Sequence, residues 1–449
     1  MESQSENRPE SRPTPSHHPS DHSSNRPLNR PLNRPLKCPV DHSVLVLDPT
    51  GRARDAETAE LIARGPAVPA DILGVQAWAV SDPDLLEELL KDPRVAKNGP
   101  RHWPDYPQVA AGWPLALWVT ARNMSTTDVE HHRRLRRLVS AALTPRQVAA
   151  LTDRIERMTA GLLDAVAAEG AGGAPVDLRQ HLARALPILV ISHLLGLPDE
   201  LRDGFCRYAE GVFDTTLTPE RSQANSAALY AVIATLVAAK RERPGEDMTS
   251  LLIAARDTEG DGGALTEDEL LDTLMLVIAA GYETTVNLID NSVALLLTHP
   301  DQLALVRAGR AGWDDAVEES LRREAPLAHL PMRYALEDIA LPGGPTVHRG
   351  EAILASYAAA GRHPARHGDG GAEFDVTRQA KDHLAFGHGP HFCLGAPLAR
   401  LEARTALRAL FERFPRLALA PDTALEPVES LISNGHRTLP VLLEGPAQG

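Results

Sequence analysis

The sequence predicts a mainly α-helical protein, with one large helical domain and small β-sheets. Three observations support this fold class. Between residues 130 and 325 nearly every segment has apolar residues at helical spacing and is rich in Ala, Leu and Arg. Short stretches typical of strands and turns occur before and after this region. No second hydrophobic unit follows a linker, which favours one α-dominated domain.

The composition sets limits on the function. A chain of 449 residues with 43% hydrophobic residues can bury a large core. Its net charge of −14 argues against general nucleic-acid binding. Three cysteines, Cys38, Cys206 and Cys393, make no disulfide framework. The best apolar run, residues 274–280, is far shorter than the ~20 residues that cross a bilayer. We therefore expect a cytoplasmic protein without a membrane span.

The first 37 residues differ from all the others. They are rich in Pro, Ser, His, Asn and Arg, and NRPL occurs three times in tandem over residues 25–36. Such a segment cannot bury enough apolar surface to offset the entropy lost on ordering. We expect residues 1–37 to form a disordered tail and residues 38–449 to form the folded domain.

The folded region begins with strand and helix signals. Residues 66–80 indicate a strand pair around Gly74. Ser81 or Asp82 then caps a helix that has proline in its first turn and leucines at helical spacing. Beyond the long helical region, residues 338–357 are typical of short strands and turns.

The longest predicted helix begins at a capping box formed by Thr266 and Glu269. Its apolar pattern continues to Leu297, and His299-Pro300 ends it. A helix of about 30 residues spans roughly 45 Å.

The middle of this helix, AAGYETT, contains residues that are unfavourable in a buried helix. Glycine at 281 costs about 1 kcal/mol relative to alanine, and a buried Glu283 must be paired or protonated. Thr284 can bond back to the carbonyl of Ala280 and loosen the helix there. Ala280 and Gly281 would then leave room for a ligand, with an acid and a hydroxyl beside it. The alternative is a core helix that tolerates one glycine.

A second unusual stretch is FGHGPHFCLG, residues 386–395. Its glycines allow a tight bulge and a close approach of the backbone to something flat. Pro397 lies where a helix should begin, so backbone N–H groups would lower the pKa of a thiol at Cys393. The alternative is a cysteine that serves as a small buried hydrophobe. The complete pattern Phe-Gly-x-Gly-x-His-x-Cys-x-Gly is far more specific than a lone cysteine.

Two further motifs occur in the same order, Glu319-x-x-Arg322 and the earlier His132-x-x-x-Arg136. Each is weak alone, since the first could be a solvated ion pair and the second a surface helix face. Together the four motifs make residues 45–443 resemble the cytochrome P450 family, the haem-thiolate monooxygenases. The resemblance implies the P450 fold, with haem b between the long central helix and the helix that follows the cysteine loop.

The resemblance also implies roles for single residues. Cys393 would be the metal ligand, and Thr284 and Glu283 the catalytic pair that handles protons. His132, Arg136, Arg333 and His391 would bind the haem carboxylates. The implied cofactor-binding residues are His132, Arg136, Ala280, Gly281, Arg333, Phe386, Gly387, His391, Cys393 and Gly395.

Closer similarity points to actinomycete P450s that hydroxylate steroids and macrolides. It implies that one atom of O2 enters an aliphatic C–H bond of a bulky hydrophobic substrate. The chain has no flavin or iron–sulfur segment, so electrons from NAD(P)H would arrive through ferredoxin reductase and ferredoxin. Arginines at 133, 134, 136, 137, 400, 404 and 408 would form a basic patch for that partner, or else ordinary solvated helix faces.

We expect an apolar substrate pocket. The expected lining residues are Val277, Ala280, residues 327–330, Leu431 and Ile432, with Val212, Phe213 and Leu217 closing over them. The expected polar anchors are His329, Ser433 and Asn434, too few to require a charged substrate.

Other functions stay open at this stage. The same oxidant could catalyse oxidative C–C or C–N coupling of an aromatic or cyclic-dipeptide natural product. A peroxygenase would use hydrogen peroxide directly, which the Glu283–Thr284 pair argues against. A haem carrier or gas sensor would be a non-enzyme, but no sensor domain is visible.

Overall fold

The computed structural model describes residues 44–258 and 265–445. The predicted tail, residues 1–37, therefore lies outside the described residues. The helices are α1 (Arg54–Arg64), α2 (Pro83–Lys91), α3 (Gly99–His102), α4 (Tyr106–Gly112), α5 (Leu117–Thr120), α6 (Val129–Ala142), α7 (Pro145–Ala150), α8 (Thr152–Glu169), α9 (Ala185–Leu195), α10 (Asp199–Gly211), α11 (Pro219–Glu242), α12 (Met248–Thr258), α13 (Glu267–Thr298), α14 (Pro300–Arg307), α15 (Trp313–Arg323), α16 (Tyr357–Arg362), α17 (Pro364–His367) and α18 (Ala396–Arg413). The prediction of a mainly α fold is confirmed.

The strands are short. They are β1 (Leu45–Val46), β2 (Ala67–Ile72), β3 (Val75–Val80), β4 (Val95–Ala96), β5 (Val176–Asp177), β6 (Leu330–Ala335), β7 (Ile339–Ala340), β8 (Thr346–Val347), β9 (Ala352–Ala355), β10 (Ala418–Leu419) and β11 (Pro440–Leu442). The largest sheet has the order β1-β2-β3-β9-β6-β4, and two smaller sheets join β10-β11-β5 and β7-β8.

The six-stranded sheet joins segments that are far apart in the chain. β2 and β3 form the predicted antiparallel pair around Gly74, and β3 continues in parallel with β9. At the sheet edge β4 pairs antiparallel with β6, with Val95 opposite Ala335 and Ala96 opposite Tyr334. This edge therefore brings residues near position 97 beside residues near position 333.

Local capping signals set the helix starts as expected. Of the two candidate caps for α2, Asp82 is the one that accepts the N–H groups of Asp84 and Leu85, at 3.0 and 2.9 Å. At the start of α13 both bonds of the Thr266–Glu269 capping box form. Each box or cap satisfies N–H groups that a helix leaves without partners.

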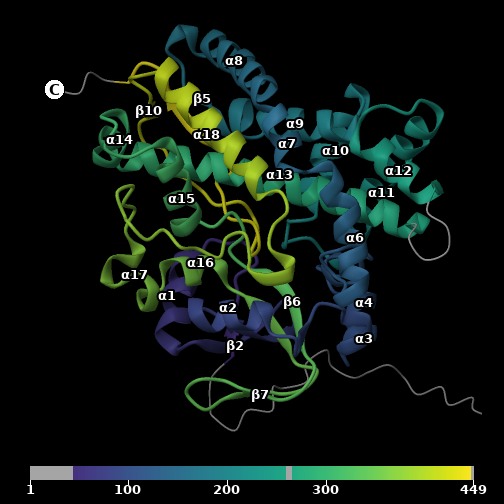
Figure 1. Ribbon diagram of the computed structural model, residues 1–449. Helices are drawn as coiled ribbons and strands as arrows, with labels where there is room; N and C mark the ends of the chain where they lie inside the picture. Colours follow the sequence, from purple (N-terminus) through teal and green to yellow (C-terminus); the bar gives the residue numbers. More distant parts are fainter. Residues whose placement is uncertain (1–43, 259–264, 446–449) are drawn as a thin grey trace, which may run out of the picture. The chain divides into compact units, whose positions relative to one another are not determined.

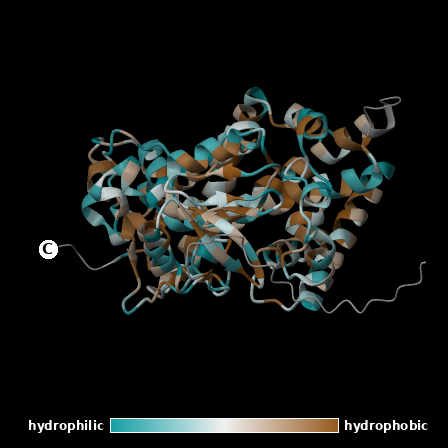
Figure 2. Ribbon diagram, turned by 90° about the horizontal axis from the view of Figure 1, so that it is seen from below, coloured by the Kyte–Doolittle hydropathy of each residue, from teal (hydrophilic) through white to brown (hydrophobic). Residues whose placement is uncertain are grey.

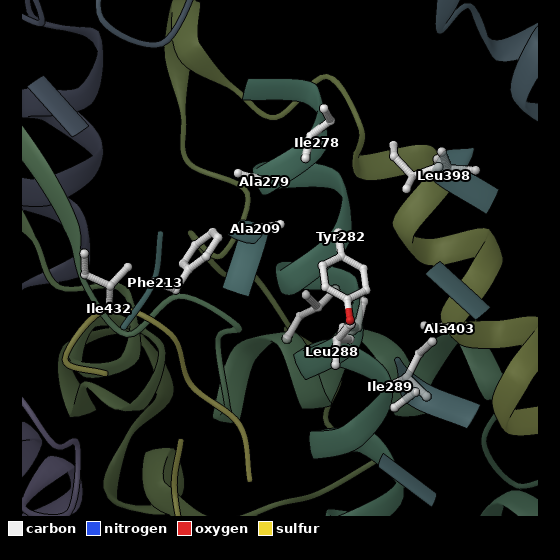
Figure 3. Packing of buried hydrophobic residues seen from close by; sticks show 14 of the residues in the cluster. Ala209, Phe213, Ile278, Ala279, Tyr282, Leu288, Ile289, Leu398, Ala403 and Ile432 are labelled. Carbon is white, nitrogen blue, oxygen red and sulfur yellow. The ribbon is translucent and has the colours of Figure 1, made fainter. Parts of the chain in front are cut away.

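The long helix α13 runs through the middle of the helical region, with α18 packed along it (Figure 1). Figure 3 shows Ile278 and Ile289 of α13 and Leu398 of α18 among buried hydrophobic side chains. Burying side chains of this size stabilises the fold by about 1.5–3 kcal/mol each. Figure 2 shows hydrophobic and hydrophilic residues within the same helices, as expected where one side of a helix faces the core.

The Glu319–Arg322 pair is part of the core. Both side chains are fully buried and joined by two bonds, Arg322 Nε to Oε2 at 2.8 Å and Nη2 to Oε1 at 2.7 Å. Arg322 also donates to the carbonyls of Gly361, Gly371 and Glu373, each at 2.6 Å. The alternative of a solvated ion pair is wrong, and the pair fastens α15 to the segment that precedes the cysteine loop.

Among the described residues one helix, α11, is long and apolar enough to cross a membrane by length and composition alone. Counting the bent pair formed by residues 179–195 and 199–211 as one span would give two. Helices of soluble proteins pass the same test, so this is weak evidence for a membrane span.

Candidate active site

A cavity of about 300 Å³ lies between α13, α6, β6 and the cysteine loop. Apolar side chains make up most of its lining. It brings together predicted site residues that are up to 263 positions apart in the chain. Those that line it are His132, Arg136, Ala280, Gly281, Thr284, Arg333, Phe386, Gly387, His391, Cys393 and Gly395. Glu283 is the one predicted site residue that is not in the lining.

The cysteine loop is closed by its own backbone. Gly387 has a φ of 71°, which favours glycine, and the N–H of Cys393 donates to the carbonyl of Phe386 at 2.9 Å. The guanidinium of Arg400 lies 4.6 Å from the centre of the Phe386 ring and covers it. These contacts hold the thiol of Cys393 at the cavity wall.

The electrostatic environment of Cys393 differs from the expectation. Burial raises the pKa of the Cys393 thiol, although the backbone N–H groups of Gly395 and Ala396 act in the opposite direction. The N–H groups thus act as predicted, but burial outweighs them, so the net shift of the Cys393 pKa is upward. A metal cation at Sγ would supply the missing positive charge, because coordination deprotonates a thiol.

Cationic side chains gather at the side of the cavity formed by α6 and β6. The rings of His132 and His391 lie 4.1 Å apart, and Arg136 donates to the carbonyl of Phe392 at 2.8 Å. Burial, together with the neighbouring His132, lowers the pKa of His391 to about 2. Arg333 is buried, and its Nη1 atom has no hydrogen-bond partner. Such a donor requires an acceptor in the cavity.

The α13 segment at the cavity is a continuous helix. Thr284 Oγ1 donates to the Ala280 carbonyl at 2.6 Å, as expected, but the helix does not open there. A side chain at 281 would begin 2.9 Å from the end of Ile191, which itself lines the cavity. Gly281 therefore makes room for Ile191, and not only for a ligand.

Comparison with known proteins identifies the family. The family model for cytochrome P450 matches residues 208–308 and 313–439, more than half of the chain. The chain is a cytochrome P450. The structure of the P450 CYP154A1 from Streptomyces coelicolor A3(2) is similar, with a TM-score of 0.86 and 57% identity; 89% of this chain and all of that one are covered.

Two curated P450 relatives are similar over most of their length. The 2-hydroxy-5-methyl-1-naphthoate 7-hydroxylase of Streptomyces carzinostaticus is 40% identical, covering 89% of this chain and 98% of the relative. The 6-deoxyerythronolide B hydroxylase of Saccharopolyspora erythraea is also 40% identical, covering 86% and 95%. This P450 is therefore a monooxygenase of the bacterial type.

P450s carry haem iron, and the cavity of this P450 fits that group. A thiol stands at one wall, glycine and apolar side chains form the faces, and cations gather at one end. The unpartnered nitrogen of Arg333 is a donor that a haem carboxylate can satisfy.

Glu283 lies outside the cavity lining of the P450. Its Oε1 atom accepts bonds from Ser433 at 2.8 Å and Asn287 at 3.2 Å, and Arg179 lies 3.6 Å away. Burial raises the pKa of Glu283, while the charge of Arg179 acts in the opposite direction. Glu283 directly precedes Thr284 in the sequence, but its carboxyl belongs to a buried polar network and not to the cavity wall.

The expected pocket lining is confirmed in part. Val212, Phe213, Val277, Ala280, Leu327 and Leu330 line the cavity. Leu217, Leu431, Ile432, Ala328 and the three expected polar anchors do not. His329 contacts Ser356 at 3.1 Å, Ser433 bonds to Glu283, and Asn434 bonds to Glu324 at 3.0 Å. The polar anchors are engaged with protein partners, which leaves the pocket more apolar than expected.

Sequence reasoning missed two charged residues of the cavity, Lys97 and Glu402. Glu402 is buried, and its Oε2 atom has no hydrogen-bond partner; burial raises the pKa of its carboxyl to about 8. The sequence does contain a signal for Glu402. It lies four residues from Leu398 and four from Ala406, so it falls on the apolar face of α18, where a glutamate is unusual. Lys97 directly follows the apolar strand β4.

The predicted basic patch is largely neutralised by nearby acids. Arg134 pairs with Glu269, Arg400 with Glu318, Arg404 with Asp314 and Arg408 with Glu412. Although burial opposes the shift, bonds from Arg400 and His383 lower the pKa of Glu318 to about 2. Arg133 and Arg137 are exposed, and within the described residues neither has an ion pair.

Proposed function

We propose that this P450 inserts one oxygen atom from O2 into an aliphatic C–H bond of a bulky, mostly apolar substrate. The observation that carries the proposal is the apolar cavity that has Cys393 at one wall and the Thr284 hydroxyl on α13. A bound haem iron with a thiolate ligand supplies the oxygen chemistry, because the sulfur donates electron density that favours O–O cleavage.

In this proposal Cys393 is the iron ligand, and the Phe386, Gly387 and Gly395 backbone shapes the face next to it. His132, Arg136, Arg333 and His391 bind the two carboxylates through charge-assisted or neutral hydrogen bonds. The Arg333 nitrogen that lacks a partner supports this assignment. Ala280 and Gly281 would leave room for the group beside the α13 backbone.

Thr284 and Glu283 handle protons in the proposed reaction. Thr284 lines the cavity and holds a proton at Oγ1, which it can redirect from the Ala280 carbonyl to a group in the cavity. Glu283 lies in the network behind it, where burial favours the protonated carboxyl. Ser433 and Asn287 fix the orientation of that carboxyl.

Thr284→Ala should separate NAD(P)H consumption from product formation. Without the Oγ1 proton, product per NAD(P)H should fall roughly 10- to 100-fold, within what one positioned proton donor contributes. Hydrogen peroxide should rise in its place, and Thr284→Ser should restore most of the coupling. If the alanine variant and the native enzyme form the same amount of product per NAD(P)H, Thr284 has no role in the mechanism.

The substrate proposal rests on the lining of the cavity. Trp118, Phe213, Leu194, Val277 and Leu327 offer apolar contacts, and the three candidate polar anchors are engaged elsewhere. A ligand there is bound mainly by buried area, at about 25 cal/mol per Å². A steroid or a macrolide ring fits this chemistry. The name of the 6-deoxyerythronolide B hydroxylase supports the macrolide, whereas the naphthoate hydroxylase widens the range to aromatic acids.

Ligand-induced changes of the haem spin state test the substrate class. Titration should show micromolar binding of steroids or macrolide aglycones and weaker binding of small polar compounds. If only cyclic dipeptides or aromatic acids shift the spin state, the substrate class is wrong and oxidative coupling becomes the better proposal.

The proposed electron donor is a ferredoxin that is reduced by an NAD(P)H-dependent reductase. Exposed Arg133 and Arg137 on α6 and exposed Phe392 beside Cys393 form a small docking surface. Its positive charge would attract an acidic partner to a protein that is acidic overall. These partners fit a cytoplasmic location.

A further inference from the structure

Lys97 is a buried cation that lies opposite another buried cation. In the antiparallel register Ala96 is opposite Tyr334, so Lys97, one residue further, comes opposite Arg333. Residues opposite each other across an antiparallel pair point to the same face, and like charges there are destabilising. Both side chains are buried, at 7% and 4% exposure, and both line the cavity.

The protein supplies little to neutralise Lys97. The nearest carboxylate, Asp128, is used by backbone groups, because its oxygens accept the N–H of Lys97 at 2.7 Å and of Asn98 at 3.1 Å. The ammonium nitrogen itself lies 3.5 Å from the Pro331 carbonyl, at the limit of a hydrogen bond. Burial lowers the pKa of Lys97, and the charge of Arg333 lowers it further.

A buried ammonium is costly without an anion. Lysine chains elsewhere on proteins avoid this cost by extending to water, but strand β4 and the Asp128 bonds hold the Lys97 backbone at the sheet edge. The cavity is therefore the place where an anion would have to lie. An anion between Lys97 and Arg333 would convert their repulsion into two attractions.

We propose that Lys97 binds a carboxylate of the haem, together with Arg333. The inference rests on the proposed function, which places the haem carboxylates at the cationic end of the cavity. Lys97 would bind the carboxylate from the β4–β6 edge of the sheet, in addition to the residues that α6 and the cysteine loop provide. Lys97 thus joins the side chains already assigned to the two carboxylates, which are His132, Arg136, Arg333 and His391.

The transfer of haem to excess apomyoglobin measures this interaction without using catalysis. Lys97→Met keeps the length and apolar stem of the side chain but removes the charge. We expect it to speed haem loss about 10- to 100-fold, the value of one hydrogen bond between charged groups. Lys97→Arg should retain most of the affinity. The matched control is Lys91→Met, because the Lys91 side chain is 51% exposed and should leave the rate unchanged.

A second probe, haem dimethyl ester, separates carboxylate binding from packing. The ester lacks both carboxylates, so native protein and Lys97→Met should lose it at rates within about twofold of each other. If Lys97→Met speeds the loss of haem and of the ester equally, Lys97 contributes only packing and the proposal is wrong. An unchanged rate of haem loss in Lys97→Met would also overturn the proposal. If the methionine variant does not accumulate, Lys97→Gln gives the same comparison.

Arg333→Met shows which of the two proposals is at fault. If it speeds the loss of haem but not of ester while Lys97→Met has no effect, only the Lys97 assignment is wrong. If neither variant distinguishes haem from ester, the carboxylates do not lie at this end, and the placement in the proposed function is wrong as well.

Discussion

Cys393→His is expected to abolish the absorption band that marks thiolate-ligated haem in the reduced, carbon monoxide-bound protein. Histidine can bind iron, but it does not donate electron density as a thiolate does. Product formation should therefore fall below detection even where the variant retains haem. The measurement is the spectrum of the reduced, carbon monoxide-bound protein minus that of the reduced protein, with haem content determined separately.

Cys206→Ser is the matched control for this substitution. Cys206 is the other free cysteine within residues 44–258 and 265–445, and it does not line the cavity. Its replacement should leave the thiolate band and product formation unchanged. A thiolate band that survives in Cys393→His, or vanishes in Cys206→Ser, contradicts the assignment of the iron ligand.

Arg322→Met is expected to produce the largest loss of stability. It removes a partner of the fully buried Glu319 and three bonds from α15 to the chain before the cysteine loop. Breaking a buried pair from one side costs about 3–5 kcal/mol. Natural domains have only about 5–15 kcal/mol of stability, so little would remain. Urea unfolding followed by circular dichroism measures the change.

The control for Arg322 is another arginine that pairs with a glutamate on its own helix. Arg408 and Glu412 on α18 are 65% and 59% exposed. Because water screens an exposed pair, Arg408→Met should leave the free energy of unfolding close to that of the native protein. Equal losses in the two variants would show that burial of the Glu319–Arg322 pair is not what makes it important.

Features that depend on neighbours in the sequence could be predicted well. The capping box at Thr266, the proline at the start of α2 and the hairpin around Gly74 are local signals, and each lies where it was expected. The cysteine loop is equally local, since its closing bond joins Phe386 and Cys393. Hence the fold class and the centre of the site follow from the sequence.

Features that depend on distant neighbours could not be predicted. The partner of Glu283 is Ser433, 150 residues away, so the sequence did not indicate that this carboxyl points away from the cavity. Burial of the Glu319–Arg322 pair depends on a segment about 40 residues downstream. The pKa of Cys393 has the opposite direction from the expectation because desolvation outweighs the local N–H groups.

The order in which the cavity residues leave the ribosome has a consequence for assembly. Lys97 and Arg136 are synthesised early, whereas Cys393 emerges about 300 residues after Lys97. At about 5–20 residues per second, roughly 15 to 60 seconds separate the first cation from the thiol. For most of that interval β4 also lacks β6, the strand that places Arg333 opposite Lys97. The proposed cofactor site can therefore be complete only when translation is nearly finished, and we expect haem capture to be a late, essentially post-translational event.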